Sequence, residues 1–423
     1  MTSQNRRPTM KDNQAKYPQL RFKGFTNPWE QRKLGEIVAI KITNGLMNRP
    51  GGNLLAVKDI NVVNMYTPDH IHVEDLEYFN ATDKDLSRCD VTKGDVFVTR
   101  SSLKAEGIAE PNVLLENGRF VFDDHLMRLK PRPEINPYFL KELLSSTSVK
   151  KQFIAKAKTA TMTTIGQQDI STSDARFPSS TEQKLIAELL QKIDSTIALH
   201  QRKLAKLKEL KQSYLQKLFP ENGSKFPQLR FSGFADAWEQ RKLGELADIV
   251  GGGTPSTNND EYWNGDIDWY SPVEINNQIY VSGSKNKITE LGLQKSSAKV
   301  LPIGTVLFTS RAGIGKTAIL AKKGTTNQGF QSILPHENKL DSYFIFSRTD
   351  ELKRYGETNG AGSTFVEVSG KQMSKMPIML PKIEEQMRIG TFFQQLDNLI
   401  TLHQRKLEKL QELKKGYLQK MFC

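Results

Sequence analysis

One stretch of the sequence carries residues of a phosphate-binding loop. In "TSRAGIGKTAIL", residues 309–320, Gly315, Lys316 and Thr317 follow one another as they do at the end of such a loop. The loop also requires a glycine five residues before Gly315, and Ser310 stands there. The alternative is a Gly-rich turn that places Arg311 and Lys316 against a phosphate or a base edge, or that merely connects two elements.

A second polar stretch, "GGGTPSTNNDEYWNGDIDWY", covers residues 251–270. Its amide side chains, Asn258 and Asn259, are of the type that pairs bidentately with adenine. We interpret Trp263 and Trp269 as core residues rather than stacking platforms. The candidate nucleic-acid contacts of the whole chain are basic and small polar residues: Lys58, Arg100, Lys104, Thr254, Ser256, Asn258, Asn259, Arg311 and Lys316.

The remaining motifs of enzymes and metal sites are missing from the sequence. There is no GxSxG elbow, no GxGxxG after a predicted strand and no NPPY-like tetrapeptide. Of the six histidines only His70 and His72 lie close together, so we expect no metal site. Cys89 and Cys423 are far apart, which predicts two reduced thiols rather than a disulfide. We therefore expect no catalytic residues.

Composition and charge narrow the class of protein. Sixty Lys and Arg face 47 Asp and Glu, a net charge of +13 in 423 residues, and the pI is about 9.4. This balance suits a polyanionic partner, although a basic protein without one stays an alternative. Without a long uncharged apolar stretch or a signal-like N-terminus, the sequence predicts a cytoplasmic protein with no membrane contact.

Two segments of the chain occur twice. Residues 17–36, "YPQLRFKGFTNPWEQRKLGE", return at residues 226–245 with 15 of 20 positions identical. Residues 199–219 return at residues 402–422 with 16 of 21 positions identical. We call these segments the frame. They enclose two inserts, the first at residues 37–181 and the second at residues 246–384, so the chain is a duplicated domain.

The two inserts resemble each other only faintly. "LLAVKDIN" at residues 54–61 aligns with "WYSPVEIN" at residues 269–276, and "VTKGDVFVTR" at 91–100 with "VLPIGTVLFTS" at 300–310. "DVFVT" and "TVLFT" are typical of strands, whereas "PYFLKELLSS" and "SYFIFSRTDELKRY" are typical of helices. The inserts are predicted to be α+β domains of one shared fold.

The end of each repeat predicts a long helix with a heptad seam. The apolar positions alternate in steps of four and three, interrupted by one histidine in each helix and later by Lys211 and Lys414. The seam residues are Ile186, Leu190, Ile193, Ile197, His200, Leu204 and Leu207 in the first helix, and Ile389, Phe393, Leu396, Ile400, His403, Leu407 and Leu410 in the second. The seams predict that the helices pair with each other or with another chain.

Together, "PQLRFSGF.D.WEQRKLGE", "GGGTPST....YWNGDIDW", "TSRAGIGKTAI" and "EQ" followed by "LHQRKL.KL.ELK" resemble the specificity subunit of type I restriction-modification enzymes. The resemblance covers nearly the whole chain. It implies that each insert is a target recognition domain for one half of a split site in double-stranded DNA, and that the helices form an antiparallel spacer. The first insert departs from the pattern, because "ITNGLMNRPGGN" at residues 42–53 replaces "GGGTPST".

The same resemblance implies the partners. Two modification subunits would methylate adenine with S-adenosylmethionine, and restriction subunits would use ATP and Mg²⁺, while this chain binds no cofactor itself. The expected fold class is α+β with an internal pseudo-twofold repeat and an intramolecular antiparallel coiled coil. Its expected parts are a disordered tail (1–16), recognition domains (17–180 and 221–383) and helices (181–220 and 384–423).

Two other functions stay open at the level of the sequence. A coiled-coil adaptor could bind DNA without reading bases, and a P-loop ATPase or nuclease with coiled-coil arms could use the loop at Lys316.

Overall fold

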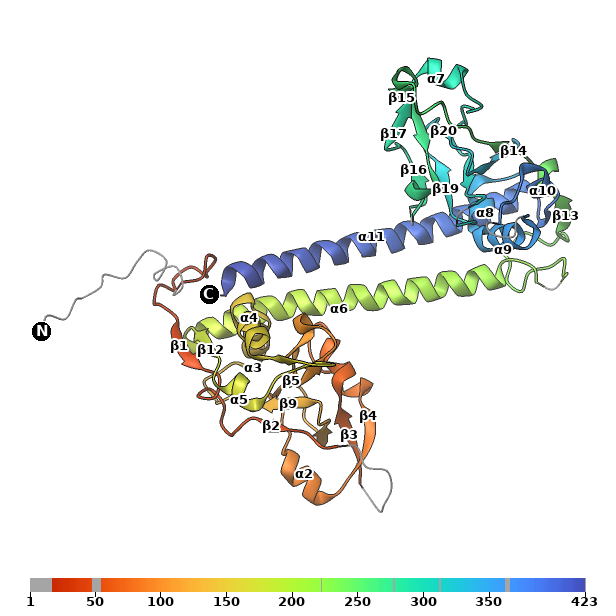
Figure 1. Ribbon diagram of the computed structural model, residues 1–423. Helices are drawn as coiled ribbons and strands as arrows, with labels where there is room; N and C mark the ends of the chain where they lie inside the picture. The colour runs from red at the N-terminus through yellow and green to blue at the C-terminus, as the bar shows by residue number, and fades with distance from the viewer. Residues whose placement is uncertain are drawn as a thin grey trace, which may run out of the picture. The chain divides into compact units, whose positions relative to one another are not determined.

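The computed structural model describes residues 17–47, 55–221, 223–276, 278–311, 313–361 and 366–422. The expected disordered tail and Cys423 lie outside these ranges. The chain divides into two compact units, the first made of residues 1–204 and 403–423 and the second of residues 205–402. The long helices α6 (Ser180–Lys217) and α11 (Ile383–Met421) each contribute one half to each unit (Figure 1).

The first unit combines small sheets with short helices. Its strands are β1 (Glu30–Lys33), β2 (Thr43–Asn44), β3 (Leu55–Ile60), β4 (Glu77–Ala81), β5 (Val96–Thr99), β6 (Ser101–Ser102), β7 (Pro111–Val113), β8 (Phe120–Phe122), β9 (Leu126–Leu129), β10 (Lys158–Thr159), β11 (Thr163–Thr164) and β12 (Asp174–Phe177). They form sheets in the orders β2-β9-β5-β7, β4-β3-β8, β10-β11-β6 and β1-β12. The helices are η1 (Val62–Tyr66), η2 (Val73–Asp75), α2 (Asp83–Cys89), η3 (Ala105–Gly107), α3 (Pro137–Ser145), α4 (Thr147–Lys156) and α5 (Gln167–Ser171).

The second unit repeats this plan with longer strands. Its strands are β13 (Glu239–Lys242), β14 (Ala247–Gly251), β15 (Trp263–Tyr270), β16 (Tyr280–Val281), β17 (Asn286–Ile288), β18 (Val306–Phe308), β19 (Thr317–Leu320), β20 (Thr325–Thr326), β21 (Gln331–Pro335) and β22 (Pro377–Leu380). The sheet orders are β14-β21-β18-β19-β16, β17-β15-β20 and β13-β22. The helices are η4 (Leu243–Glu245), η5 (Asp260–Tyr262), η6 (Pro272–Glu274), α7 (Glu290–Gln294), α8 (Ser342–Ser347), α9 (Thr349–Asn359) and α10 (Gly370–Met373).

The shared fold of the inserts is confirmed, and the predicted strands are β5 and β18. One of the two sequence alignments is wrong by five residues. Asp123 N donates to Ile60 O at 3.0 Å, and Asn327 N donates to Tyr270 O at 3.0 Å, so Ile60 corresponds to Tyr270 rather than to Ile275. The two strand ends carry different side chains. The sequence alignment instead matched the Ile-Asn pair at residues 60–61 with the one at residues 275–276, which are not structural counterparts.

The prediction of one helix in "SYFIFSRTDELKRY" is also wrong, because α8 ends at Ser347 and α9 begins at Thr349. Ser347 Oγ donates to Tyr343 O at 2.8 Å, and Thr349 Oγ1 donates to Phe346 O at 2.6 Å. Such bonds compete with the helical pattern. Arg348, between the two helices, donates to Met379 O and so leaves the helical path. The corresponding α3 forms as predicted, capped by Asn136 and beginning with Pro137.

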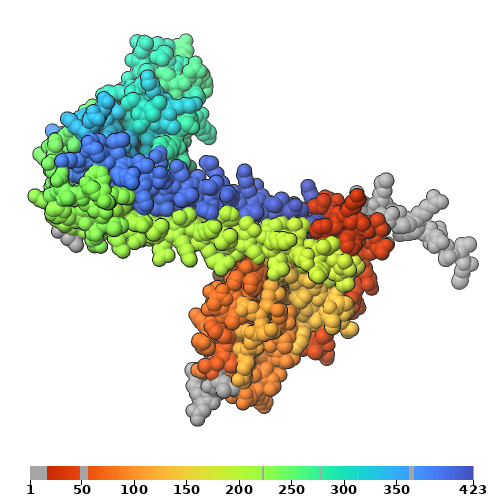
Figure 2. Space-filling model, turned by 180° about the vertical axis from the view of Figure 1, so that it is seen from behind, coloured from red at the N-terminus to blue at the C-terminus, as the bar shows by residue number. Residues whose placement is uncertain are grey.

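Each insert is fastened to the long helices by an apolar core. In the first unit, Ile186 and Leu190 of α6 and Met421 of α11 pack with Phe139 and the other buried residues of the insert. The insert lies against the first half of α6 in both views (Figure 1; Figure 2). In the second unit, Ile389 and Phe393 of α11 take the corresponding place beside Phe344.

Frame residues make the same contacts in both units. Arg21 forms a two-pronged ion pair with Glu182 at 2.7 and 2.8 Å, and Arg230 does so with Glu385 at 2.8 and 2.7 Å. In the first unit a frame loop also ties the end of a long helix, because Leu20 N donates to Lys420 O at 2.8 Å. In the second unit Leu229 N donates to Lys217 O at 2.9 Å. Duplication of the sequence therefore duplicates the contacts.

The halves of α6 and α11 run antiparallel within each unit. In the first unit His200 lies beside His403, with 2.7 Å between the two Nδ1 atoms, and Asp194 lies beside Lys414 at 2.7 Å. In the second unit Lys211 Nζ lies 2.6 Å from Asp397 Oδ1. These contacts explain the polar interruptions of the seams, since each seam lysine meets a buried aspartate of the partner helix. Nine of the fourteen predicted seam residues named above are buried, namely Ile186, Leu190, Ile193, Ile197, Leu204, Ile389, Phe393, Leu396 and Leu407.

Candidate nucleic-acid interface

Both inserts pass a glycine-containing loop closely over a strand end. A Cβ atom on Gly45 would lie 2.0 Å from Phe122 O, and one on Gly252 would lie 2.0 Å from Asn327 O, so only glycine fits. Leu46 N donates to Phe122 O at 2.7 Å, as Gly253 N does to Thr326 O at 2.8 Å. The described part of the "ITNGLMN" segment is therefore the structural counterpart of the "GGGTPST" loop. We call the two loops with their strand ends the recognition edges.

At the recognition edge of the second unit, three polar side chains lie near one another. Thr254 Oγ1 donates a short hydrogen bond to Gln328 Oε1, and Gln328 is exposed. Arg311 borders Gly329, the residue after Gln328. The Nε atom of Arg311 is 3.6 Å from where a Cβ atom on Gly329 would lie. The half-buried guanidinium of Arg311 is 4.0 Å from Glu367 Oε2, a distance that leaves its donors accessible to another acceptor.

The rest of the same loop is shaped by the two tryptophans. Trp269 Nε1 donates to Gly253 O at 2.8 Å and Trp263 Nε1 to Ser256 O at 3.0 Å, while the rings meet edge to face at 5.1 Å. Trp269 is buried, as expected for a core residue. Ser256 and Asn258 are exposed. Asn259 instead caps η5, accepting from Glu261 N at 3.1 Å, so its oxygen is engaged within the chain.

The P-loop interpretation of Lys316 is wrong, because its residues connect two antiparallel strands. Lys316 leads directly into β19, which pairs with β18, whereas a P-loop leads into a helix. Thr309 holds the turn, since its Oγ1 donates to Gly313 O at 2.8 Å and accepts from Lys316 N at 2.9 Å. Gly313 and Gly315 have φ values of 104° and 98°, which side-chain-bearing residues rarely adopt. Lys316 is exposed at the end of this turn.

In the first unit an arginine, Arg100, stands at the backbone position of Ser310, the residue before Arg311. Its N donates to His125 O at 2.7 Å, just as Ser310 N donates to Gly329 O at 2.8 Å. The Arg100 side chain is exposed and donates weakly to Asp124 O at 3.4 Å. It lines a hollow of about 520 Å³ whose other polar walls include Asn44, Asn80 and Arg88. The sequence pattern did not single out these wall residues, nor Gln328 in the second unit, because polar loop residues carry no distinctive spacing.

The other two basic candidates of the first unit differ in their surroundings. Lys104 is exposed in the loop before η3. Lys58 is partly buried, and its Nζ donates to Leu76 O at 2.8 Å and lies 4.6 Å from the centre of the exposed Tyr78 ring. The structure therefore brings Arg100 to the recognition edge but engages the charge of Lys58 inside the insert.

A partly buried carboxyl group, that of Asp59, lies next to the first recognition edge. Burial, together with the neighbouring charges of Asp123 and Glu77, raises the pKa of Asp59 to about 6. Asp59 Oδ1 is buried without a hydrogen bond to any described residue. In the second unit, Asp268 lies at the corresponding strand. Burial would raise the pKa of Asp268, but Ser284 and Lys287 outweigh burial and lower it.

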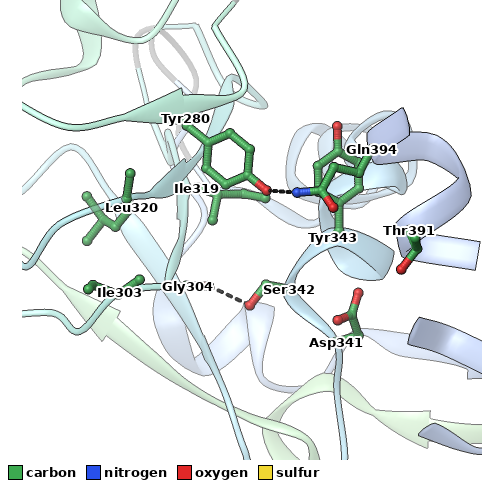
Figure 3. A pocket seen from close by; sticks show the side chains of 11 residues that line it. Tyr280, Ile303, Gly304, Ile319, Leu320, Asp341, Ser342, Tyr343, Thr391 and Gln394 are labelled. Carbon is green, nitrogen blue, oxygen red and sulfur yellow. Dashed lines mark hydrogen bonds between the residues drawn. The ribbon is translucent and has the colours of Figure 1, made fainter. Parts of the chain in front are cut away.

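The hollow between the second insert and α11 has a structural role (Figure 3). It measures about 230 Å³. Gln394 of α11 donates to Tyr280 Oη at 2.6 Å across it, and Ser342 Oγ donates to Gly304 O at 2.7 Å. Asp341 accepts from Phe344 N at 2.7 Å as the cap of α8. These polar groups fasten the insert to the helix.

Two further features concern the expectations that the chain has no metal site and no membrane contact. His70 and His72, for which we expected no metal site, lie with Asp69 in one cluster of possible metal ligands. None of the helices in the described part of the chain combines the length and apolar character that crossing a bilayer requires.

The chain is similar to known proteins along both of its repeats. The model of a family described as type I restriction modification DNA specificity domain matches residues 26–209 and again residues 235–412. The type I restriction enzyme MjaIX specificity subunit of Methanocaldococcus jannaschii is 36% identical over 179 residues, 42% of this chain and 41% of that protein. The putative MjaX specificity subunit of the same organism is 24% identical over 397 residues, 92% of this chain and 91% of that protein.

A solved structure has the same fold. The S subunit of a type I restriction-modification system from M. genitalium superposes with a TM-score of 0.63 at 15% identity, covering 96% of this chain and 99% of that one. The fold class expected from the sequence is thereby confirmed. Because the family model covers most of the chain in two copies, this chain belongs to the type I restriction-modification DNA specificity family.

Proposed function

We propose that this chain is a non-catalytic subunit that reads a split target in double-stranded DNA, one half with each insert. The observation that carries the proposal is the pair of recognition edges, which share their backbone contacts but differ in their side chains. Arg100 and Asn44 stand at the first edge, and Thr254, Gln328 and Arg311 at the second. Arginine and amide side chains are the groups that most often read base edges in the major groove.

The frame is the proposed docking surface for two modification subunits. Each copy of the frame exposes an apolar pair beside a helix end, Tyr17 and Leu20 in the first unit and Phe226 and Leu229 in the second. Their exposed fractions lie between 40% and 55%. An apolar surface that occurs twice with nearly the same sequence suits two copies of one partner. Restriction subunits would join the same assembly, and S-adenosylmethionine, ATP and Mg²⁺ would bind to the partners.

Genome-wide mapping of methylated adenine tests this function directly. The chain would be co-expressed with a candidate modification subunit in a host without other adenine methylation. The expected result is methylation of a motif made of two short words with a fixed spacer of unspecified bases. Methylation without any split motif would favour the non-specific adaptor. A matched strain that expresses the modification subunit alone controls for methylation independent of this chain.

The long helices are proposed to set the spacer between the two words. Removing one seven-residue repeat from both α6 and α11 keeps the seam in register, so we expect unchanged half-sites with a shorter spacer. The same deletion in α6 alone breaks the register of the paired helices and is expected to abolish methylation. An active double deletion with the original spacer would contradict this role of the helices.

A further inference from the structure

A cluster of possible metal-ligand side chains lies in the first insert, on residues that are not part of the recognition edge described above. Asp69, His70 and His72 occupy the segment between η1 and η2, and their ligand atoms all lie within 4.8 Å of one another. The carboxylate of Asp69 is buried, with 3% of the residue exposed, whereas the two imidazoles are partly exposed. The cluster therefore has a buried base and an open side.

The two imidazoles converge on the carboxylate. His72 Nε2 lies 2.9 Å from Asp69 Oδ1, and His70 Nδ1 lies 3.4 Å from Asp69 Oδ2. The ring centroids of the histidines are 4.3 Å apart. His70 Nδ1 is buried and makes no hydrogen bond to any described residue. One nitrogen of each ring therefore lies beside the Asp69 carboxylate, each next to a different oxygen, and the possible ligand atoms of the three residues lie within 4.8 Å of one another.

The backbone around the cluster is held by Thr67 of the same segment and by residues of two other segments, β7 and α3. Thr67 Oγ1 donates to His70 O at 2.7 Å, and Asn112 Nδ2 donates to Thr67 Oγ1 at 2.8 Å. Ile71 N donates to Val113 O at 3.0 Å, and Lys141 Nζ donates to Pro68 O at 3.0 Å. Because these bonds fix both sides of the turn, the ligands are positioned before any ion arrives.

We propose that Asp69, His70 and His72 bind one transition-metal dication of the zinc class. Two imidazole nitrogens and one carboxylate suit Zn²⁺, Co²⁺ or Ni²⁺, whereas Mg²⁺ and Ca²⁺ prefer oxygen ligands. Three protein ligands leave a coordination position for water on the open side. The nitrogen that would not bind the metal, His72 Nδ1, lies 3.6 Å from Glu74 Oε1.

The site belongs to the first unit alone. By the strand pairings of Ile71 with Leu114 and of Val281 with Leu320, His70 corresponds to Tyr280 in the second insert. Tyr280 bonds to Gln394 instead. The expected stoichiometry is therefore one metal ion per chain.

The chain offers a matched control. Asp123, Asp124 and His125 also form a cluster of possible ligands, but His125 is 61% exposed and is its only imidazole. A single histidine with two carboxylates gives a weaker site for a zinc-class ion than two histidines. His125→Gln should therefore leave the proposed metal site unchanged.

The test uses the untagged full chain, stripped with a chelator and dialysed. Calorimetric titration with Zn²⁺ should give one ion per chain, and Co²⁺ should give the visible absorption of a low-coordinate site. His70→Gln and His72→Gln should each weaken Zn²⁺ binding by more than about tenfold, because each removes a direct ligand. Zn²⁺ should raise the unfolding temperature of the wild type and of His125→Gln, but not of the two ligand variants.

Three results would overturn the proposal. They are no stoichiometric binding of either ion, unchanged binding in both ligand variants, and loss of binding in His125→Gln. Circular dichroism in the presence of chelator shows whether each ligand variant is folded. If one variant is unfolded, Zn²⁺ binding by the other variant decides the test. The measurement needs no DNA or partner subunit, so its outcome is independent of the proposed recognition function.

Discussion

The junction between insert and long helices is built from charges in the first unit and largely from apolar groups in the second. In both, a tyrosine hydroxyl donates to a buried aspartate, Tyr138 to Asp194 at 2.7 Å and Tyr343 to Asp397 at 2.8 Å. In both, a seam lysine of the other helix pairs with that aspartate. This Tyr-Asp-Lys set is the part of the junction that the two units share.

The first unit adds a second ion pair to this set. Lys141 Nζ lies 2.8 Å from Glu142 Oε1 and 3.4 Å from Asp194 Oδ2, and Lys414 Nζ lies 3.2 Å from Glu142. At the corresponding positions after Tyr343 the second unit has Phe346 and Ser347. Two positive and two negative charges meet in the first unit and one of each in the second, so both junctions are neutral. The comparison shows that the net charge of this buried junction stays at zero, because each additional positive side chain is accompanied by a negative one.

Exchange of a whole insert should have the largest effect on this comparison. Replacing residues 246–384 with the insert of another family member keeps the frame contacts, so one half-site of the methylated motif should change completely. The other half-site should stay as it is. Adenine-methylation mapping of the exchanged chain provides the measurement. A change in both halves would show that the inserts do not read DNA independently.

The charge balance of the junction gives the next largest effect. Lys141→Met leaves one buried carboxylate without a partner and should lower the free energy of unfolding of the first unit by about 3–5 kcal/mol. Lys141→Phe combined with Glu142→Ser removes a neutral pair and reproduces the second unit, so it should cost much less. Hydrogen exchange of residues 137–145 reports the local stability. Equal losses in the single and the double variant would refute the pairing argument.

The two arginines of the recognition edges should have smaller and separate effects. Arg100→Ala and Arg311→Ala should each relax the methylated motif at one base pair in a different half-site, at a cost of about 1–3 kcal/mol in binding free energy. Arg354→Ala on α9 serves as a control for loss of a positive charge. Weakened binding without relaxed sequence preference would mean that the arginines contact phosphates instead.

The smallest predicted effect concerns Asp59. Its pKa is about 6 in the folded chain against an ordinary value of 3.8, so folding favours the neutral carboxyl. The free energy of unfolding should therefore fall as pH rises from about 4 to about 6, and Asp59→Asn should stabilise the first unit at pH 7 by about 1–2 kcal/mol. Denaturant unfolding at pH 4 and pH 7 measures this difference. Identical gains at both pH values would exclude titration of Asp59 as the cause.

The sequence predicted the parts of the molecule that obey periodicity or repetition. The heptads and the near-identical frame located α6, α11 and the duplicated contacts, because both depend on spacing alone. The register of β3 against β15 and the break at Arg348 were missed, since tertiary hydrogen bonds decide them. The metal-ligand cluster was missed for a simpler reason, namely that Asp69 adjoins His70 in sequence but was not counted with the histidines.

The contact between His200 and His403 has a consequence for the duplicated sequence. A neutral imidazole has one N–H donor, so at 2.7 Å one Nδ1 must donate while the other accepts. Burial lowers the pKa of His200, and the charge of His403 lowers it further, which keeps two protons from occupying the contact together. Two positions that are identical in sequence therefore cannot be identical in chemistry at the same instant, and a single proton is enough to distinguish one repeat from the other.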